Sequence, residues 1–148
     1  MTGTTFQYPE NRQLRICGIV GRELLAQPDM LDRNGRPSLV VFKDGSTTGL
    51  TVGRYSCLES FTREDGLKSI EIAIYNHEKM FGPFCDKGDS GSLIFDGLGR
   101  MVGLLHSGQS KRGVPGGYVA YATPIWWLIG RIKERYPHAI FDGTAWCL

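Results

Sequence analysis

The sequence has no run of about 18 consecutive apolar residues, the length that a helix needs to cross a bilayer. Residues 1–5 also lack the positively charged segment and the apolar segment that open a secretory signal. We therefore expect no membrane partner. The absence of a signal favours an intracellular location without fixing the compartment.

Clusters of basic residues are equally scarce. The formal net charge is +2, and the longest basic cluster is the pair Lys111-Arg112. Proteins that bind nucleic acid need lysine and arginine gathered on one surface, often with aromatic residues between them. The basic residues of this chain are dispersed, so we expect no nucleic-acid partner.

Cysteines are few and far apart, at positions 17, 57, 85 and 147. The sequence contains no Cys-x-x-Cys pair, so a structural zinc site is not expected. Nothing else in the sequence calls for a cofactor. Without a secretory signal, free thiols are expected at Cys17, Cys57, Cys85 and Cys147. A disulfide such as Cys85 to Cys147 stays open, because the sequence gives no distance between them.

Glycine is abundant, with 20 residues among 148, and turn residues separate many short apolar runs. A chain of this length is expected to form one domain with a real core. Alternating apolar residues favour strands over helices; in the clearest case Ile70, Ile72 and Ile74 share one face. We predict strands at residues 38–42, 47–58, 68–75, 92–95, 100–107 and 117–122.

One helix is predicted after the last strand. Thr123 is a good N-cap, and Pro124 suits the first helical position. The apolar residues that follow fall on one helical face, at Ile125, Leu128, Ile129 and Ile132. Pro137 ends the pattern. In the tail beyond it, we expect Phe141 and Trp146 to pack back against the domain.

The most informative stretch runs from Phe84 to Phe95. Gly88 and Gly91 flank Ser90 and allow sharp or left-handed backbone at no steric cost. A tight turn of this kind can aim two backbone N–H groups at one spot, which is how an oxyanion hole is built. Taken alone, the motif is equally typical of an ordinary turn, because aspartate and serine favour turns.

The segment Gly88-Asp89-Ser90-Gly91-Ser92, followed by Leu93-Ile94-Phe95, resembles the nucleophile loop of chymotrypsin-like serine proteases. With the later segments in order, residues 38–136 resemble the C-terminal barrel of that family. Residues 41–53 further resemble one branch, the plant narrow-leaf type and the fungal trypsin-like proteins. The resemblance implies an all-β fold, a six-stranded antiparallel β-barrel with a C-terminal α-helix.

The same resemblance divides the chain into three parts. Residues 1–37 form an N-terminal arm or connector, residues 38–136 the barrel with its helix, and residues 137–148 a C-terminal tail. Within the first part, residues 14–20 suit a strand or extended connector, and residues 23–26 a short helical turn.

The resemblance also implies roles for individual residues. Ser90 is the nucleophile, and the N–H groups of Gly88 and Ser90 form the oxyanion hole. The implied substrate pocket is lined by Phe84, His106, Ser107, Gly108 and Gly117. Phe84 stands six residues before Ser90, where the family has its pocket floor. One extra residue between Cys85 and Gly88 makes ordinary core packing of Phe84 an equal alternative.

The catalytic base is what the sequence does not supply. In the family, the histidine and aspartate of the triad come from a first barrel. Residues 1–37 contain no histidine and are too short for six strands. Of His77, His106 and His138, only His106 is expected near Ser90, as a cleft-wall or packing residue or, less readily, as a substitute base.

Two functions therefore stay open from sequence. The chain is the C-terminal lobe of a trypsin-like serine peptidase that lacks its own catalytic histidine and aspartate, or a non-catalytic interaction module with the same fold. The expected partners are a peptide or protein substrate, or a partner barrel. Self-association is also open, because a lone barrel would expose the apolar face that normally packs on its partner.

Overall fold

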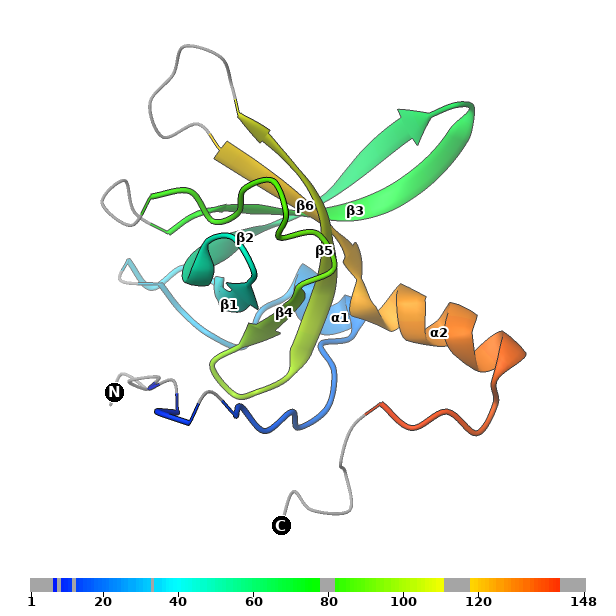
Figure 1. Cartoon of the computed structure of the whole chain (residues 1–148), viewed down its shortest axis with the longest axis horizontal. Helices are drawn as coiled ribbons and strands as arrows, with labels where there is room; N and C mark the ends of the chain where they lie inside the picture. Colours follow the sequence, from blue (N-terminus) through cyan, green and yellow to red (C-terminus); the bar gives the residue numbers. More distant parts are fainter. Residues whose placement is uncertain are drawn as a thin grey trace.

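Six antiparallel strands close into a barrel in the computed structural model of the chain, in the order β1-β2-β3-β6-β5-β4 (Figure 1). The structure describes residues 7, 9–11, 13–32, 34–77, 82–110 and 118–141. The strands are β1 (Leu39–Gly45), β2 (Gly49–Glu64), β3 (Leu67–Asn76), β4 (Leu93–Asp96), β5 (Met101–Ser110) and β6 (Tyr118–Pro124). The helices are α1 (Arg22–Ala26) and α2 (Ile125–Arg135). The predicted fold class is confirmed.

The core fills the barrel, because alternate residues along a strand point to its inner face. Ile72 and Ile74 on β3 are fully buried, as their spacing predicts, and Val41 and Ile94 meet them from β1 and β4. Gly53 lets the ring of Phe84 come close to β2, since a Cβ there would lie 2.7 Å from the ring. Phe84 is thus part of the barrel core.

The C-terminal helix begins one residue later than the sequence predicts. Thr123 still belongs to β6, where it pairs with Leu104, and Pro124 is the N-cap with an extended ψ of 133°. The prediction of Thr123 as the cap is wrong, because the strand ladder keeps this residue extended. Ile129 is buried on the inner face of α2, and Phe141 packs on the same cluster, as expected. Trp146 lies outside the described residues.

The segment before the barrel packs onto it. Val20 and Leu25 are almost fully buried and belong to the barrel core. Ile19 forms a parallel bridge with Met101 at the start of β5. Asp29 receives two hydrogen bonds from Arg100, at 2.9 and 3.0 Å. Residues 19–29 therefore pack on the barrel and stabilise it, as well as connecting the N-terminal residues to β1. Short helix α1 lies where the sequence predicts a helical turn.

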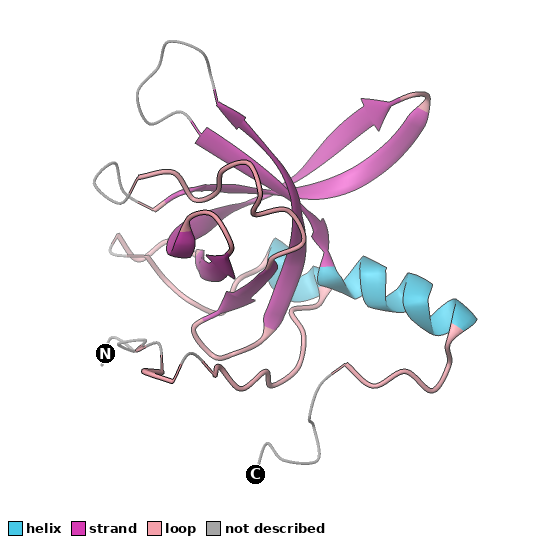
Figure 2. Cartoon of the chain, viewed as in Figure 1, coloured by secondary structure: helices cyan, strands magenta, loops and turns pink. Residues whose placement is uncertain are grey.

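Beyond the barrel wall, β2 and β3 continue together as a two-stranded ribbon that projects from the body of the molecule (Figures 1 and 2). Pairing of β3 with β6 begins at Ile72 and Ala122, so residues 67–71 of β3 pair only with β2. Phe61 and Leu67 on this ribbon are about three-quarters exposed. No helix in the described part of the chain is long and apolar enough to cross a membrane.

Candidate functional site

Ser90 lies on two consecutive tight turns directly before β4. The N–H of Asp89 donates to the carbonyl of Asp86 at 3.1 Å, and the N–H of Ser92 donates to the carbonyl of Asp89 at 3.1 Å. Both turns need a residue with positive φ, which Gly88 (105°) and Gly91 (89°) supply. The result is a serine that stands exposed on a loop anchored at both ends.

The backbone N–H groups of Gly88 and Ser90 have no acceptor within the described part of the chain. Each is therefore available to an oxygen atom of a ligand. Gly88 also approaches the Thr47 side chain closely, since a Cβ at this position would overlap the Thr47 hydroxyl. That hydroxyl in turn donates to the carbonyl of Lys87 at 2.9 Å. The conformation of this loop thus depends on glycine.

Beneath the loop, Asp89 forms a buried ion pair with Lys43. The two side chains are fully buried, and Lys43 Nζ lies 3.3 Å from Asp89 Oδ2. The Asp89 carboxylate also accepts hydrogen bonds from the N–H of Thr47 at 2.8 Å, the hydroxyl of Thr48 at 2.6 Å and the N–H of Asp86 at 3.0 Å. Asp89 therefore fastens the serine loop to the hairpin between β1 and β2.

Burial alone would raise the pKa of Asp89, but its hydrogen bonds oppose it. Donation from Thr48, Asp86 and Thr47 outweighs desolvation and holds the pKa of Asp89 well below its usual range. The carboxylate therefore stays ionised against its buried lysine. Sequence reasoning missed Lys43, although it follows Leu39 and Val41 at the inward positions of β1.

The depressed pKa of Asp89 predicts a dependence of stability on pH. The stabilisation is fully present above the unfolded pKa of about 4 and is lost as pH falls through the folded pKa. We expect the free energy of unfolding to decrease on acidification below about pH 4, and to decrease less steeply in Asp89→Asn. Urea unfolding of both proteins across this range measures the difference. Parallel curves would contradict the expectation.

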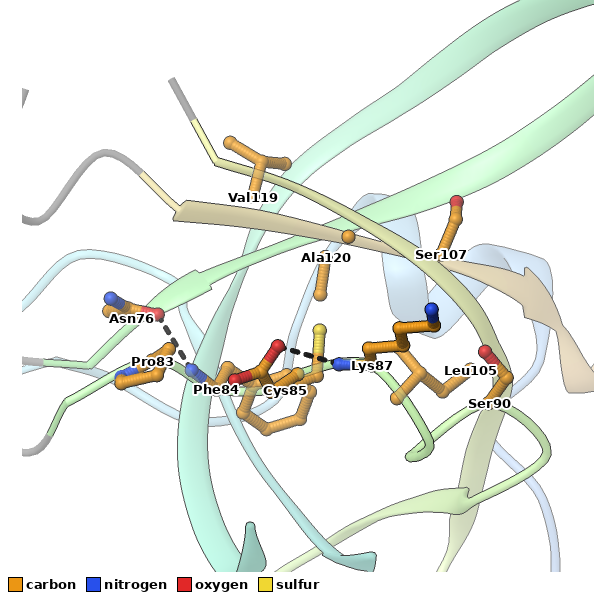
Figure 3. A pocket seen from close by; sticks show the side chains of 12 residues that line it. Asn76, Pro83, Phe84, Cys85, Lys87, Ser90, Leu105, Ser107, Val119 and Ala120 are labelled. Carbon is orange, nitrogen blue, oxygen red and sulfur yellow. Dashed lines mark hydrogen bonds between the residues drawn. The ribbon is translucent and has the colours of Figure 1, made fainter. Parts of the chain in front are cut away.

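A cavity of about 470 Å³ opens beside Ser90 (Figure 3). Among the residues predicted to line a substrate pocket, Phe84, Ser107 and Gly108 line this cavity, together with Ser90 itself. Phe84 is also 1% exposed and part of the core, which confirms the core-packing alternative; its role as the floor of a substrate pocket stays a prediction. Gly117 lies outside the described residues.

One wall of the cavity carries the thiol of Cys85. A Cβ on Gly108 would lie 2.8 Å from Cys85 Sγ, so glycine at this position keeps the space open. Burial raises the pKa of the Cys85 thiol, which favours the neutral form. Neither Cys17 nor Cys57 forms a disulfide within the described part of the chain, and Cys147 lies outside the described residues. The described part of the chain holds no cluster of three or more potential metal ligands.

His106 lies beside Ser90, but its ring is directed elsewhere. The Ser90 hydroxyl donates to the backbone carbonyl of His106 at 3.1 Å. The imidazole Nε2 lies 2.8 Å from Glu71 Oε2, on β3. The residues described as lining this cavity include Ser107 and Gly108 but not His106, so the pocket role expected for His106 from sequence stays a prediction. His106 is the extra residue of a β-bulge in β5, and its imidazole contacts the buried carboxylate of Glu71.

The other two histidines follow β3 and α2. His77 comes directly after the last residue of β3, and His138 is exposed in the segment after α2. The structure thus brings together Ser90 and a cavity formed in part by Phe84, Ser107 and Gly108. Gly88 lies on the same loop as Ser90 but is not among the residues that line this cavity. The structure gives the Ser90 hydroxyl a carbonyl partner, which cannot accept a proton in catalysis.

Comparison with known proteins identifies the fold. No protein-family model matches the chain, and no curated protein shows significant sequence similarity to it. Among solved structures, the chain is similar to the chymotrypsin of Cellulomonas bogoriensis, with a TM-score of 0.52 and 18% sequence identity. The match covers 84% of this chain and 54% of that chain. The chain therefore spans about half of the protein that it resembles, and its barrel has the fold of a chymotrypsin-like lobe.

Proposed function

We propose that this chain is the lobe of a serine peptidase that carries the nucleophile, Ser90. The observation that supports this most directly is an exposed serine, on a double turn, at the edge of a cavity of about 470 Å³ in a chymotrypsin-like barrel. The segment at residues 41–53 supports a place in the branch with plant narrow-leaf and fungal trypsin-like proteases. The substrate is a peptide or protein.

In the proposed reaction, Ser90 Oγ attacks the carbonyl carbon of a peptide bond. The hydroxyl proton passes to a base, and the carbonyl oxygen becomes an oxyanion held by the N–H groups of Gly88 and Ser90. The tetrahedral species then expels the amine, which takes the proton from the base, and water hydrolyses the acyl-serine. The side chain that precedes the cleaved bond enters the cavity, where Phe84, Val119 and Ala120 favour an apolar group.

The base in this proposal comes from a second barrel. The Ser90 hydroxyl donates to a backbone carbonyl, and the nearby imidazole is bonded to Glu71. A histidine from a partner barrel would take the Ser90 proton in place of the His106 carbonyl, and a carboxylate behind it would fix its tautomer.

The same observation favours a second candidate, a non-catalytic module that binds peptides. A serine hydroxyl that donates its hydrogen bond to a carbonyl is a weak nucleophile, because no base takes its proton. Such a module would use the same cavity to bind an apolar side chain and would form no covalent bond.

A peptidyl boronic acid with a small apolar terminal side chain distinguishes the two candidates. A serine nucleophile adds its oxygen to boron and makes it tetrahedral, which boron-11 NMR detects. Boron is a strong electrophile, so the Ser90 proton passes to solvent when the oxygen adds to it, and the addition does not require the histidine of a partner barrel. For the peptidase lobe, we expect a tetrahedral signal that Ser90→Ala abolishes. Binding that leaves boron trigonal in both proteins supports the binding module. Absence of any binding would contradict both.

A further inference from the structure

We propose that Glu71 and His106 form a positioning pair for Ser90, acting through the backbone carbonyl of His106. The proposal rests on the proposed function, because it concerns the orientation of the same nucleophile. It assigns a role to a buried carboxylate and a half-exposed imidazole that the peptidase mechanism above does not use. Neither residue needs to touch the substrate.

Strand β5 has a bulge at His106. Leu105 pairs with Ala122 and Ser107 pairs with Tyr121, so His106 is an extra residue between two consecutive pairs. A bulge residue is not paired with a residue of the neighbouring strand. The directions of its side chain and its carbonyl are therefore not set by the hydrogen bonds of the sheet. Something other than the β5–β6 ladder has to hold His106 in place.

The carboxylate of Glu71 holds His106 in place. Nε2 of His106 lies 2.8 Å from Oε2 of Glu71, whose side chain is 7% exposed. Glu71 precedes the first residue of β3 that pairs with β6, at the root of the projecting ribbon. The pair therefore links β3 to β5 across the intervening strand β6. A buried carboxylate without a hydrogen-bond donor destabilises the fold by its full desolvation free energy. The contact between Glu71 and His106 is therefore strongly favoured.

His106 also contacts the nucleophile through its backbone. The carbonyl of the same bulge residue accepts the Ser90 hydroxyl at 3.1 Å. A serine side chain has three staggered rotamers, and a single acceptor selects among them. With the imidazole held by Glu71, the carbonyl is fixed and the Ser90 oxygen is presented in one orientation. Without that contact, the bulge is free to turn and Ser90 loses its acceptor.

The first test reads the carbonyl directly and does not need catalysis. The chain has three histidines, so labelling histidine with carbon-13 at the carbonyl gives three signals, and His106→Gln identifies the one from His106. We expect Ser90→Ala to shift this signal upfield, because its hydrogen bond is lost. Glu71→Ala is expected to give a similar shift. Glu71→Gln, whose amide oxygen still accepts from Nε2–H, is expected to leave the signal near its original position.

A matched control is Glu134→Ala, which removes an exposed ion pair with Arg131 on α2. It should not move the His106 signal. If Glu71→Ala folds, as judged by circular dichroism, and leaves the His106 signal in place, the proposal is overturned.

The second test uses His106 itself and does not depend on a Glu71 variant. His106→Gln keeps an N–H donor near the position of Nε2, whereas His106→Ala removes it. We expect the peptidyl boronate to bind the glutamine variant within about threefold of the original protein and the alanine variant about tenfold more weakly, the loss of one hydrogen bond. Equal affinity of all three proteins, or an equal loss in both variants, would overturn the positioning role. If the original protein forms no boronate adduct, the proposed function fails. The carbon-13 signal of the His106 carbonyl still tests whether Glu71 and His106 position the Ser90 hydroxyl.

Discussion

Lys43→Met is expected to lower the free energy of unfolding by about 3–5 kcal/mol. Methionine fills much of the space of the lysine stem but leaves Asp89 as a buried charge without its cation. Both side chains are fully buried, so water cannot replace the lost partner. Because Asp89 also fastens the serine loop to the hairpin between β1 and β2, the variant is expected to lose the geometry at Ser90 as well.

Urea unfolding measures this effect, and the exposed Lys133→Met on α2 is the matched control. A second variant separates the effect of the unpaired Asp89 charge from the effect of replacing the lysine side chain by methionine. In Lys43→Met combined with Asp89→Asn, an asparagine oxygen in place of Oδ1 still accepts from the N–H groups of Thr47 and Thr48. The bond from the N–H of Asp86 is lost, but no charge is buried. We expect the double variant to be more stable than Lys43→Met alone. A Lys43→Met protein as stable as Lys133→Met would show that the buried pair does not hold the loop.

Gly88→Ala is expected to reduce affinity for the peptidyl boronate by about 100-fold, the effect of losing one oxyanion donor. Gly88 has a φ of 105°, which residues with a Cβ rarely adopt, and a Cβ here would overlap the Thr47 hydroxyl. The backbone has to turn to relieve both conflicts. That turn moves the N–H of Gly88 away from the position it offers to a ligand oxygen.

Gly35→Ala is the matched control for backbone strain. Gly35 also has a positive φ, of 73°, but no atom lies within contact of an added Cβ, and the residue precedes the barrel. It should lose some stability and keep its affinity for the boronate. Isothermal titration of the two variants compares them directly. An unchanged affinity in Gly88→Ala would remove the N–H of Gly88 from the proposed oxyanion hole.

The parts that sequence predicted well depend on local patterns. Gly88 and Gly91 mark the two turns at Ser90 because positive φ is a property of the single residue. The alternation that places Ile72 and Ile74 in the core follows from the two-residue period of a strand. The start of α2 was misplaced by one residue, because pairing of Thr123 with Leu104 overrides a local capping preference.

The parts that sequence missed depend on contacts between distant residues. Lys43 carries a charge, and a charged side chain is expected at the surface unless it is paired. Its partner Asp89 is 46 positions away in the sequence, and the contact between them is what makes the burial of Lys43 favourable. Glu71 and His106 lie 35 positions apart on strands separated by β6, and a bulge sets their contact. No period in the sequence encodes such a bulge. The same holds for Val20 and Leu25, which join the core from outside the barrel.

The most direct test of the central claim, that Ser90 is a nucleophile held over a binding cavity, is a crystal structure of the chain with the peptidyl boronate. The account predicts a bond from Ser90 Oγ to boron, a boronate oxygen within hydrogen-bond distance of the N–H groups of Gly88 and Ser90, and the apolar side chain inside the cavity. A boronate seated elsewhere, or one in the cavity with no bond to Ser90, would contradict it.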